Sequence, residues 1–314
     1  MVKLDIFGCK TEYDFYNALA TAVLKQTASK VQLWMEEARD FLSRLTPRIG
    51  IPLDPLQEVN VSLGITPQTH SPEEILNLVE TIAERKQRHI VVCIDEFQEI
   101  GGFADSKQVQ GKLRSIWQHH HYTSYCLFGS KRHMMSSIFL NRSMPFYQFG
   151  NLIWLEKIPT SDWIDYIVNH FEEAGKHITP LLAEEVCTAV DNYPSYVQQL
   201  ASIVLNRLNA GECATSIIIK ESVEELIRAN EALFMQQVEP LTIYQMNLLR
   251  AIVLGIHSGY SEKSVRTNFD LGSPSNIVRL RQALIERDLV YSELKKLYIT
   301  DPVFALWFKH RFAY

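Results

Sequence analysis

An apolar run that ends in two carboxylates constrains the fold of this chain more than any other feature. Residues 90–94 are all apolar, and Asp95 and Glu96 follow them directly. Strands that are apolar on both faces are typical of parallel sheets covered by helices on each side. Ligands of such sheets bind at the carboxyl ends of the strands. The sequence therefore predicts a buried parallel strand with an acidic pair at a ligand-binding edge, although such a pair can also serve only to cap the next helix.

Strand and helix patterns alternate through the first half of the chain. Apolar runs predict further strands at residues 2–7, 122–128 and 152–155. Helical spacing of apolar residues predicts helices at residues 12–24, 31–45, 71–86 and 107–120. Prolines and an alternating stretch predict a hairpin-like insertion near residues 47–66. The alternation predicts an α/β fold with a parallel, doubly wound core over residues 1–158.

A capping pattern marks the start of the helix near residue 71. Ser71 is placed to be the N-cap, Pro72 stands at the first helical position, and Glu74 stands where a capping box has its acid. The sequence therefore predicts that this helix begins at Pro72.

Strand patterns disappear after residue 158. Four helices predict a helical domain over residues 159–239, at 162–174, 180–190, 194–208 and 221–237. Beyond it, three helices precede two short strands, at 243–254, 262–269, 275–287, 289–292 and 296–299. Three helices and a hairpin are typical of a winged helix-turn-helix, which we expect over residues 240–314.

The composition predicts a globular protein that does not enter a membrane. The chain has 314 residues, 46% of them hydrophobic, and its apolar runs are short. A bilayer-spanning helix needs roughly 20 apolar residues, and the N-terminus lacks the regions of a signal peptide. Cys93 and Cys126 fall in predicted strands, where we expect small core residues. Cytoplasmic localisation is the resulting expectation.

Charge is unevenly distributed along the chain. The formal net charge is −5, yet residues 241–314 hold ten Lys and Arg against six Asp and Glu. A modestly basic C-terminal segment is compatible with contact to a polyanion, but it does not establish one.

The glycine-rich phosphate-binding loop of nucleotide hydrolases is absent from the sequence. That loop reads Gly-x-x-x-x-Gly-Lys-[Ser/Thr], and no window of the chain fits it. The nearest stretch, residues 8–11, has the wrong spacing and is followed by Glu12 and Asp14. We interpret it as an ordinary turn between a strand and a helix.

Five motifs in order resemble those of the prokaryotic AAA+/STAND-like ATPases often called archaeal-type ATPases. They are IDEFQ at 94–98, LFGSKRHMM at 127–135, PFY at 145–147, YPSYVQQL at 193–200 and DPVFALW at 301–307. The resemblance implies a P-loop NTPase-like core, a helical lid and a C-terminal winged helix. It also implies ATP and Mg²⁺ as ligands.

The resemblance assigns roles at the ends of the core strands. Asp95 would help to hold Mg²⁺, and Glu96 would orient or deprotonate the attacking water. Ser130 matches a sensor position that reads the γ-phosphate or that water, and is otherwise a turn serine. We expect Gln98 to orient the loop instead of taking part in chemistry.

Further roles fall on cations and on the lid. Arg142 is the candidate finger toward a neighbouring nucleotide, with Lys131 and Arg132 as alternatives, and each is otherwise a surface charge. Tyr193 and Pro194 match a lid motif that touches the nucleotide, although Pro194 also suits the first position of a helix.

The sequence departs from the family pattern at its N-terminal end. In the family, the P-loop strand and helix come before the strand predicted here at residues 2–7, so the core resembles one that lacks them. The missing strand would lie between residues 122–128 and 152–155. Its absence would leave two strand edges unpaired, which is costly inside a protein.

The predicted winged helix offers candidate DNA contacts. Ile277, Leu280 and Leu284 share one face of the predicted helix at 275–287 and should be buried. The candidate contacts are Arg279 and Gln282 to bases and Lys263 and Arg266 to phosphates. Winged helices also serve as protein-interaction modules, and Glu286 would face a phosphate unfavourably.

These observations favour an ATP-dependent molecular switch whose activity in this form is poor or absent. Its nucleotide would bind between core and lid and would set the position of the winged helix. A protein partner or self-association is the expected interaction, with DNA as the alternative ligand of the winged helix. The alternative is a DNA-binding or protein-interaction module on a vestigial ATPase scaffold.

Overall fold

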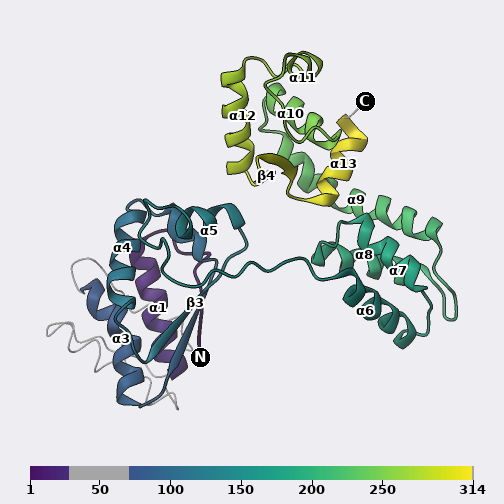
Figure 1. Cartoon of the computed structure of the whole chain (residues 1–314). Coiled ribbons are helices and arrows are strands. Elements are labelled where there is room, and N and C mark those ends of the chain that lie inside the picture. Colours follow the sequence, from purple (N-terminus) through teal and green to yellow (C-terminus); the bar gives the residue numbers. More distant parts are fainter. Residues whose placement is uncertain (28–70, 313–314) are drawn as a thin grey trace. The chain divides into compact units, whose positions relative to one another are not determined.

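The computed structural model describes residues 1–27 and 71–312, which form two compact units (Figure 1). The first unit is Met1–Ile153 and the second is Trp154–Tyr314. The helix predicted at residues 31–45 and the insertion predicted near 47–66 lie outside the described residues.

A parallel sheet of three strands forms the centre of the first unit. Its order is β1 (Val2–Asp5), β2 (Ile90–Asp95), β3 (Thr123–Leu127), and both neighbouring pairs are parallel. The chain therefore has the predicted α/β core, and the acidic pair stands at the carboxyl end of the central strand of the three.

The described helices cover one face of this sheet. The helices α1 (Glu12–Thr27), α3 (Pro72–Arg85) and α4 (Ser106–Trp117) lie on one side of the strands (Figure 1). Val92 and Ile94 point toward them and are fully buried, whereas Val91, on the other face of β2, is 37% exposed. The apolar run predicts that helices cover both faces of the sheet. Within residues 1–27 and 71–312, helices cover only one of them.

The two outer edges of the sheet differ. At β1 the Gln26 side chain accepts a hydrogen bond from the Lys3 amide at 2.9 Å and donates one to its carbonyl at 2.8 Å. At β3 the carbonyl of Tyr122 and the amide of Phe128 bond to β2. Alternate residues of a parallel strand bond to opposite sides, so Thr123, Tyr125 and Leu127 direct their backbone groups outward. In the described part of the chain no strand pairs with that edge.

The strand predicted at residues 152–155 is wrong. This segment has no regular structure, and Ile153 and Leu155 are 78% and 92% exposed. An apolar run of four residues becomes a strand only beside a strand that can pair with it. The described sheet ends at β3, so this segment has no partner there.

The capping pattern at residue 71 is only partly confirmed. The helix α3 begins at Pro72 and Ser71 is its N-cap residue, but the Ser71 side chain makes no capping hydrogen bond. The Ser71 carbonyl instead accepts the Glu74 amide at 3.2 Å. The position was predictable from the residue types, and the side-chain bond was not.

Aromatic rings pack together in the core of the first unit, next to the acidic pair in the chain. Phe97 begins a short 3₁₀ helix, η1 (Phe97–Gly102), and its ring lies 5.5 Å from the fully buried ring of Phe146. Trp117 of α4 and Phe139 of α5 (Arg132–Phe139) contact the same two rings. Arg114 donates to the carbonyls of Pro145 and Tyr147, which ties the segment 145–147 to α4.

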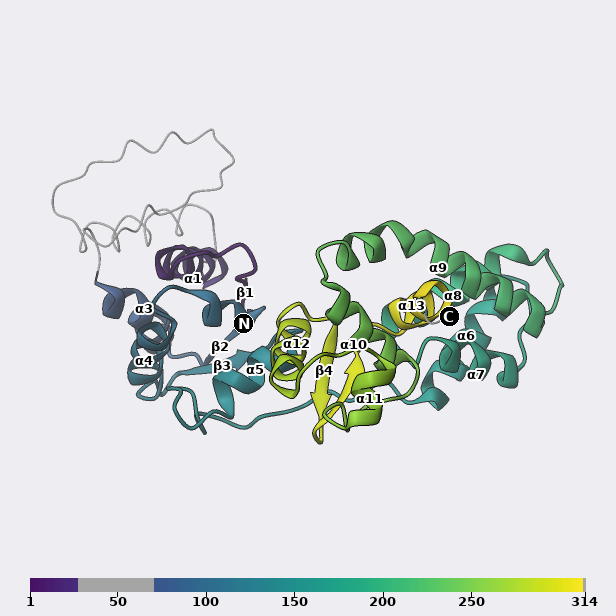
Figure 2. The same ribbon diagram turned by 90° about the horizontal axis from the view of Figure 1, so that it is seen from above.

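The second unit joins a helical part to a winged helix (Figure 2). Its helical part contains α6 (Thr160–Glu173), α7 (Pro180–Ala189), α8 (Pro194–Arg207) and α9 (Ser216–Val238). The winged helix contains α10 (Ile243–Val253), α11 (Lys263–Asn268), α12 (Pro274–Glu286), β4 (Val290–Glu293), β5 (Lys296–Ile299) and α13 (Pro302–Phe312). The strands β4 and β5 pair antiparallel as the predicted wing.

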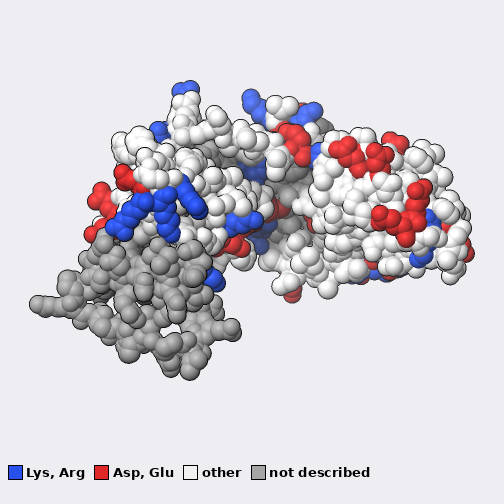
Figure 3. Space-filling model, turned by 90° about the horizontal axis from the view of Figure 1, so that it is seen from below, with Lys and Arg blue, Asp and Glu red and all other residues white. Residues whose placement is uncertain are grey.

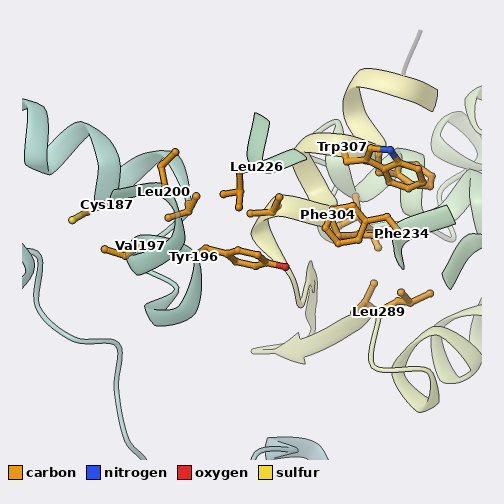
Figure 4. Close-up of a cluster of buried hydrophobic side chains, with 14 of the residues drawn as sticks. Cys187, Tyr196, Val197, Leu200, Leu226, Phe234, Leu289, Phe304 and Trp307 are labelled. Atoms are coloured by element: carbon orange, nitrogen blue, oxygen red, sulfur yellow. The ribbon is translucent and has the colours of Figure 1, made fainter. Parts of the chain in front are cut away.

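One hydrophobic core runs through both parts of this unit (Figure 4). Phe234 of α9 packs against Phe304 and Trp307 of α13, with ring centroids 5.6 Å away in each case. The Tyr196 hydroxyl of α8 donates to Asp301 at 2.6 Å, and the same carboxylate caps α13 through the Phe304 amide at 2.9 Å. The boundary that we predict near residue 239 thus falls within a continuous core, and it remains a prediction.

Several local differences from the sequence analysis have physical causes. Thr215 caps α9 by accepting the Ile218 amide at 3.3 Å, so that helix begins at Ser216, five residues before the predicted start. The helix α13 was not predicted. Cys126 is exposed and Cys93 half-buried, so the prediction that both are core residues is wrong, because both lie on the face of the sheet that none of the described helices covers. None of the described helices is long and apolar enough to cross a membrane.

Candidate functional site

The acidic pair lies where β2 turns into η1. Asp95 ends the strand, and Glu96 follows it in the left-handed conformation with φ of 54°. The Asp95 side chain accepts the Glu96 amide at 2.8 Å. A non-glycine residue at positive φ is uncommon and strained, and such residues concentrate at functional sites. The turn points the Glu96 carboxylate toward the end of β3.

Two neighbours hold the Glu96 carboxylate. Gln98 is fully buried, and its side-chain amide donates to Glu96 Oε2. Ser130, which follows β3, donates to the same oxygen at 3.3 Å. The structure thus brings together Asp95, Glu96 and Ser130 from the ends of two adjacent strands. Gln98 fits the expected orienting role, and it acts through a direct bond to Glu96.

Gly129 makes room for this arrangement. A Cβ atom at Gly129 would lie 1.8 Å from Gln98 Oε1, far inside van der Waals contact. That oxygen is buried and accepts no hydrogen bond from the described residues. The position therefore needs glycine because of a close approach, not because of its backbone angle.

We expect Gly129→Ala to displace Gln98 and release Glu96. Overpacking of this kind costs about 1–3 kcal/mol of the free energy of unfolding. Thermal unfolding would measure that loss, and Gly111→Ala is the matched control because a Cβ at Gly111 meets nothing within 4 Å. Equal unfolding temperatures for the two variants would contradict the packing argument.

Lys131 and Arg142, two of the candidate finger cations, make no described contact with the acidic pair. Lys131 pairs with Glu99 at 3.4 Å, which links the end of β3 to η1. Arg142 is exposed in a turn after α5, and no hydrogen bond or ion pair joins it to the acidic pair within the described ranges. Its role as a finger remains a prediction.

The turn at residues 8–11 holds its own carboxylate. Asp14 accepts the amides of Lys10 and Thr11 at 3.0 and 2.8 Å. Burial opposes ionisation of Asp14, but the hydrogen bonds from Thr11 and Lys10 outweigh it and lower the pKa of that carboxyl group. The Asp14 carboxylate thus accepts the backbone amides just before α1, which agrees with an ordinary turn between a strand and a helix.

The donor set at the end of β2 fits a hard cation. Mg²⁺ prefers oxygen ligands and is commonly held by one or two carboxylates together with phosphates and waters. Asp95 and Glu96 supply carboxylate oxygens there, and Asp95 Oδ1 already accepts one amide. Residues 1–27 and 71–312 gather no group of three or more His, Cys, Asp and Glu side chains, so any Mg²⁺ would need ligands from a nucleotide or water.

The predicted lid residues lie at the start of α8 in the second unit. Pro194 is the first residue of that helix, and Tyr193 before it is 39% exposed. Burial raises the pKa of Tyr193, and Asp301 and Asp288 of the winged helix add to the rise. The same motif reaches the winged-helix part of its own unit through Tyr196, whose hydroxyl donates to Asp301 at 2.6 Å.

The candidate DNA contacts are unequally available. Ile277, Leu280 and Leu284 are buried as predicted. Lys263 and Arg279 are exposed, whereas Arg266 donates to the Gly272 carbonyl at 3.2 Å and Gln282 donates to Glu286 at 2.9 Å. Two of the four candidates thus already make hydrogen bonds within the chain.

Comparisons with known proteins place this architecture. Residues 232–310 match a family model described as a probable winged helix domain. A Walker-type ATPase of Pyrococcus abyssi, 15% identical, superimposes with a TM-score of 0.65 over 98% of this chain and 83% of that one. The chain thus shares the fold of this Walker-type ATPase.

A second solved structure supports the same fold. The ORC2 protein of Aeropyrum pernix, in ADPNP–ADP complexes, is 13% identical and superimposes with a TM-score of 0.55 over 100% of this chain and 79% of that one. No curated protein matches the sequence. In this fold the described site contains the acidic pair and Ser130, while the sequence carries no glycine-rich phosphate loop.

Proposed function

We propose that the chain is part of an ATP-dependent molecular switch of the AAA+/STAND-like class. The observation that carries the proposal is the convergence of Asp95, Glu96 and Ser130 at the carboxyl ends of β2 and β3. That is the edge at which parallel sheets bind their ligands.

Each residue has a role that its position supports. Asp95 would hold Mg²⁺, and that ion would neutralise charge on the phosphates. Glu96 would orient the attacking water, with Gln98 keeping its carboxylate in place. Ser130, bonded to Glu96 at 3.3 Å, would sense the phosphate or that water.

The phosphate cradle is the part that this sequence does not encode. Cradles of this kind use backbone amides of a glycine-rich turn between a strand and a helix. The unpaired edge of β3 lies directly before Ser130, so a strand that carried such a turn could pair there. We therefore expect this chain alone to hydrolyse ATP slowly or not at all.

The second unit would move as one rigid body when nucleotide binds. Its helical part and winged helix share a core, and the Tyr196–Asp301 bond joins α8 to the cap of α13. Nucleotide contact at Tyr193 and Pro194 would therefore move α6 to α13 together.

Binding of Mg²⁺-ATP tests the proposal. Calorimetry on this chain and on a chain extended upstream should show tight binding in the extended form and weak or no binding in the chain as given. No binding by an extended form that carries a phosphate loop would refute the switch.

Glu96→Gln should slow turnover without weakening nucleotide binding. A general base contributes about 10²–10⁴-fold to a rate, so we expect a loss of that size in an ATP-hydrolysing extended form. Phosphate release measures it, and Glu73→Gln, an exposed acid of α3, is the control. Unchanged turnover would remove Glu96 from the mechanism.

DNA binding is the second candidate. It is favoured by the winged-helix match and by the excess of Lys and Arg in residues 241–314. It is opposed by residues 154–239, which hold fourteen Asp and Glu against five Lys and Arg, and Figure 3 shows acidic side chains gathered on this helical part.

A gel-shift titration across salt concentrations tests this candidate. Phosphate contacts make affinity fall steeply with salt, and Arg279→Ala should weaken binding more than Lys220→Ala in the helical part. Absence of retardation at low ionic strength would reject it.

A further inference from the structure

Two cysteines lie side by side on the open face of the first-unit sheet. Cys93 of β2 and Cys126 of β3 are register partners in the parallel ladder. Partners of this kind project from the same face, and their strands are about 4.8 Å apart. They therefore form a dithiol.

This dithiol is accessible from outside. Both cysteines are free, Cys126 is exposed and Cys93 is half-buried. Val91, on the same face of β2, is 37% exposed, and the described helices α1, α3 and α4 pack on the opposite face. An ion or small molecule can thus reach both sulfur atoms.

A cation stands beside the pair. Lys3 of β1 is the register partner of Cys93 on its other side, and it is exposed. One row across the sheet therefore reads Lys3, Cys93, Cys126. The two sulfur atoms have a positive charge at one end of the row.

We propose that Cys93 and Cys126 bind one soft monovalent metal ion of the Cu(I) class. Thiolate ligands select Cu(I), zinc or iron–sulfur clusters. Zinc sites take three or four protein ligands and clusters take four cysteines. No group of three or more His, Cys, Asp and Glu side chains occurs in residues 1–27 and 71–312, so the two-coordinate ion is the one that fits.

The charge balance of this site suits the ion. One Cu⁺ displaces the protons of both thiols and forms two Cu–S bonds, which gives a bis-thiolate complex of charge −1 and two released protons. The Lys3 ammonium offsets that negative charge.

This site is independent of the proposed ATP switch. Asp95 and Glu96 present oxygen atoms, which suit Mg²⁺, whereas the dithiol presents sulfur atoms on the sheet face. Failure of nucleotide binding would leave the dithiol unaffected, and failure of copper binding would leave the acidic pair unaffected.

Anaerobic titration of the full chain with Cu(I), against a chromophoric Cu(I) chelator, tests the inference. We expect one equivalent to bind. Cys93→Ser and Cys126→Ser should each weaken binding by more than the roughly 10- to 100-fold that loss of an outer-shell partner costs. Cys213→Ser, at an exposed single cysteine of the second unit, should bind as the original chain does.

The charge of Lys3 gives a second arm of the test. Lys3→Gln should weaken Cu(I) binding by about two- to five-fold, the size of an exposed ion pair. Lys10→Gln, an exposed lysine outside the row, should not. The buried thiols of Cys9 and Cys187, whose pKa values burial raises to about 11, should not bind Cu(I).

A measurement without substitutions keeps the inference falsifiable if a variant fails to fold. Cu(I) should protect Cys93 and Cys126 of the unaltered chain from alkylation and leave Cys213 reactive. The proposal is overturned if the chain takes no Cu(I) from the chelator, if Cys213→Ser loses as much affinity as the other two variants, or if alkylation of the pair is unchanged.

Discussion

Phe146→Ala is expected to lower the free energy of unfolding of the first unit by about 3–5 kcal/mol, the usual cost of removing a buried aromatic ring. Phe146 is fully buried, and its ring centroid lies 5.5 Å from Phe97, 5.5 Å from Phe139 and 5.0 Å from Phe149. The segment around it is held to α4 by Arg114, so it cannot collapse easily into the cavity. Urea unfolding followed by amide hydrogen exchange measures the change in this unit separately.

The matched control for this variant is Phe7→Ala. Phe7 belongs to the same unit and is the same residue type, but it is 62% exposed. Substitutions at such surface positions usually change stability by no more than about 0.5 kcal/mol. Equal losses for the two variants would show that Phe146 is not a core residue. Because Phe97 directly follows Glu96, the destabilised variant should also loosen the acidic turn.

Phe234→Ala is expected to cost a similar amount, about 3–5 kcal/mol, in the second unit. Its ring is fully buried against Phe304 and Trp307, so its loss removes the aromatic contacts of α9 with α13 (Figure 4). Since one core runs through the unit, we expect faster hydrogen exchange in α8 and α9 as well as in α13. Mass spectrometry of the exchanged peptides measures it.

Leu233→Ala is the control for this second prediction. Leu233 is the preceding residue of the same helix and is 51% exposed, so its loss should change stability little. If α13 alone lost protection in Phe234→Ala, the helical part and the winged helix would be independent folding units. That outcome would favour a boundary near residue 239 over a single body.

The acidic site was predictable from sequence to the level of its main residues. Asp95 and Glu96 follow an apolar run that is typical of a strand, and Ser130 follows the next such run, so parallel pairing brings them to one edge. The hydrogen bond from Gln98 to Glu96 was not predictable. It depends on the left-handed turn at Glu96 and on the close approach of Gly129, which are contacts between separate strands.

The wrong predictions from the sequence also have a common cause. Residues 152–155 are apolar enough for a strand and form none, because a strand needs a neighbour to pair with. Cys93 and Cys126 are apolar enough for a core and face outward, because no described helix covers that side of the sheet. Residue type gives the preference, and the surroundings decide whether it is satisfied.

The amino-acid sequence alone determined the order of the elements, the positions of most helix starts, the wing and the acidic pair, because these depend on periodicity and on residues close together in the chain. Only the tertiary structure decided which face of the sheet the described helices cover, that Gln26 bonds to the edge of β1 while no described strand pairs with β3, and that the helical part and the winged helix share one core. Those features depend on contacts between residues far apart in the chain, and local preferences do not encode them.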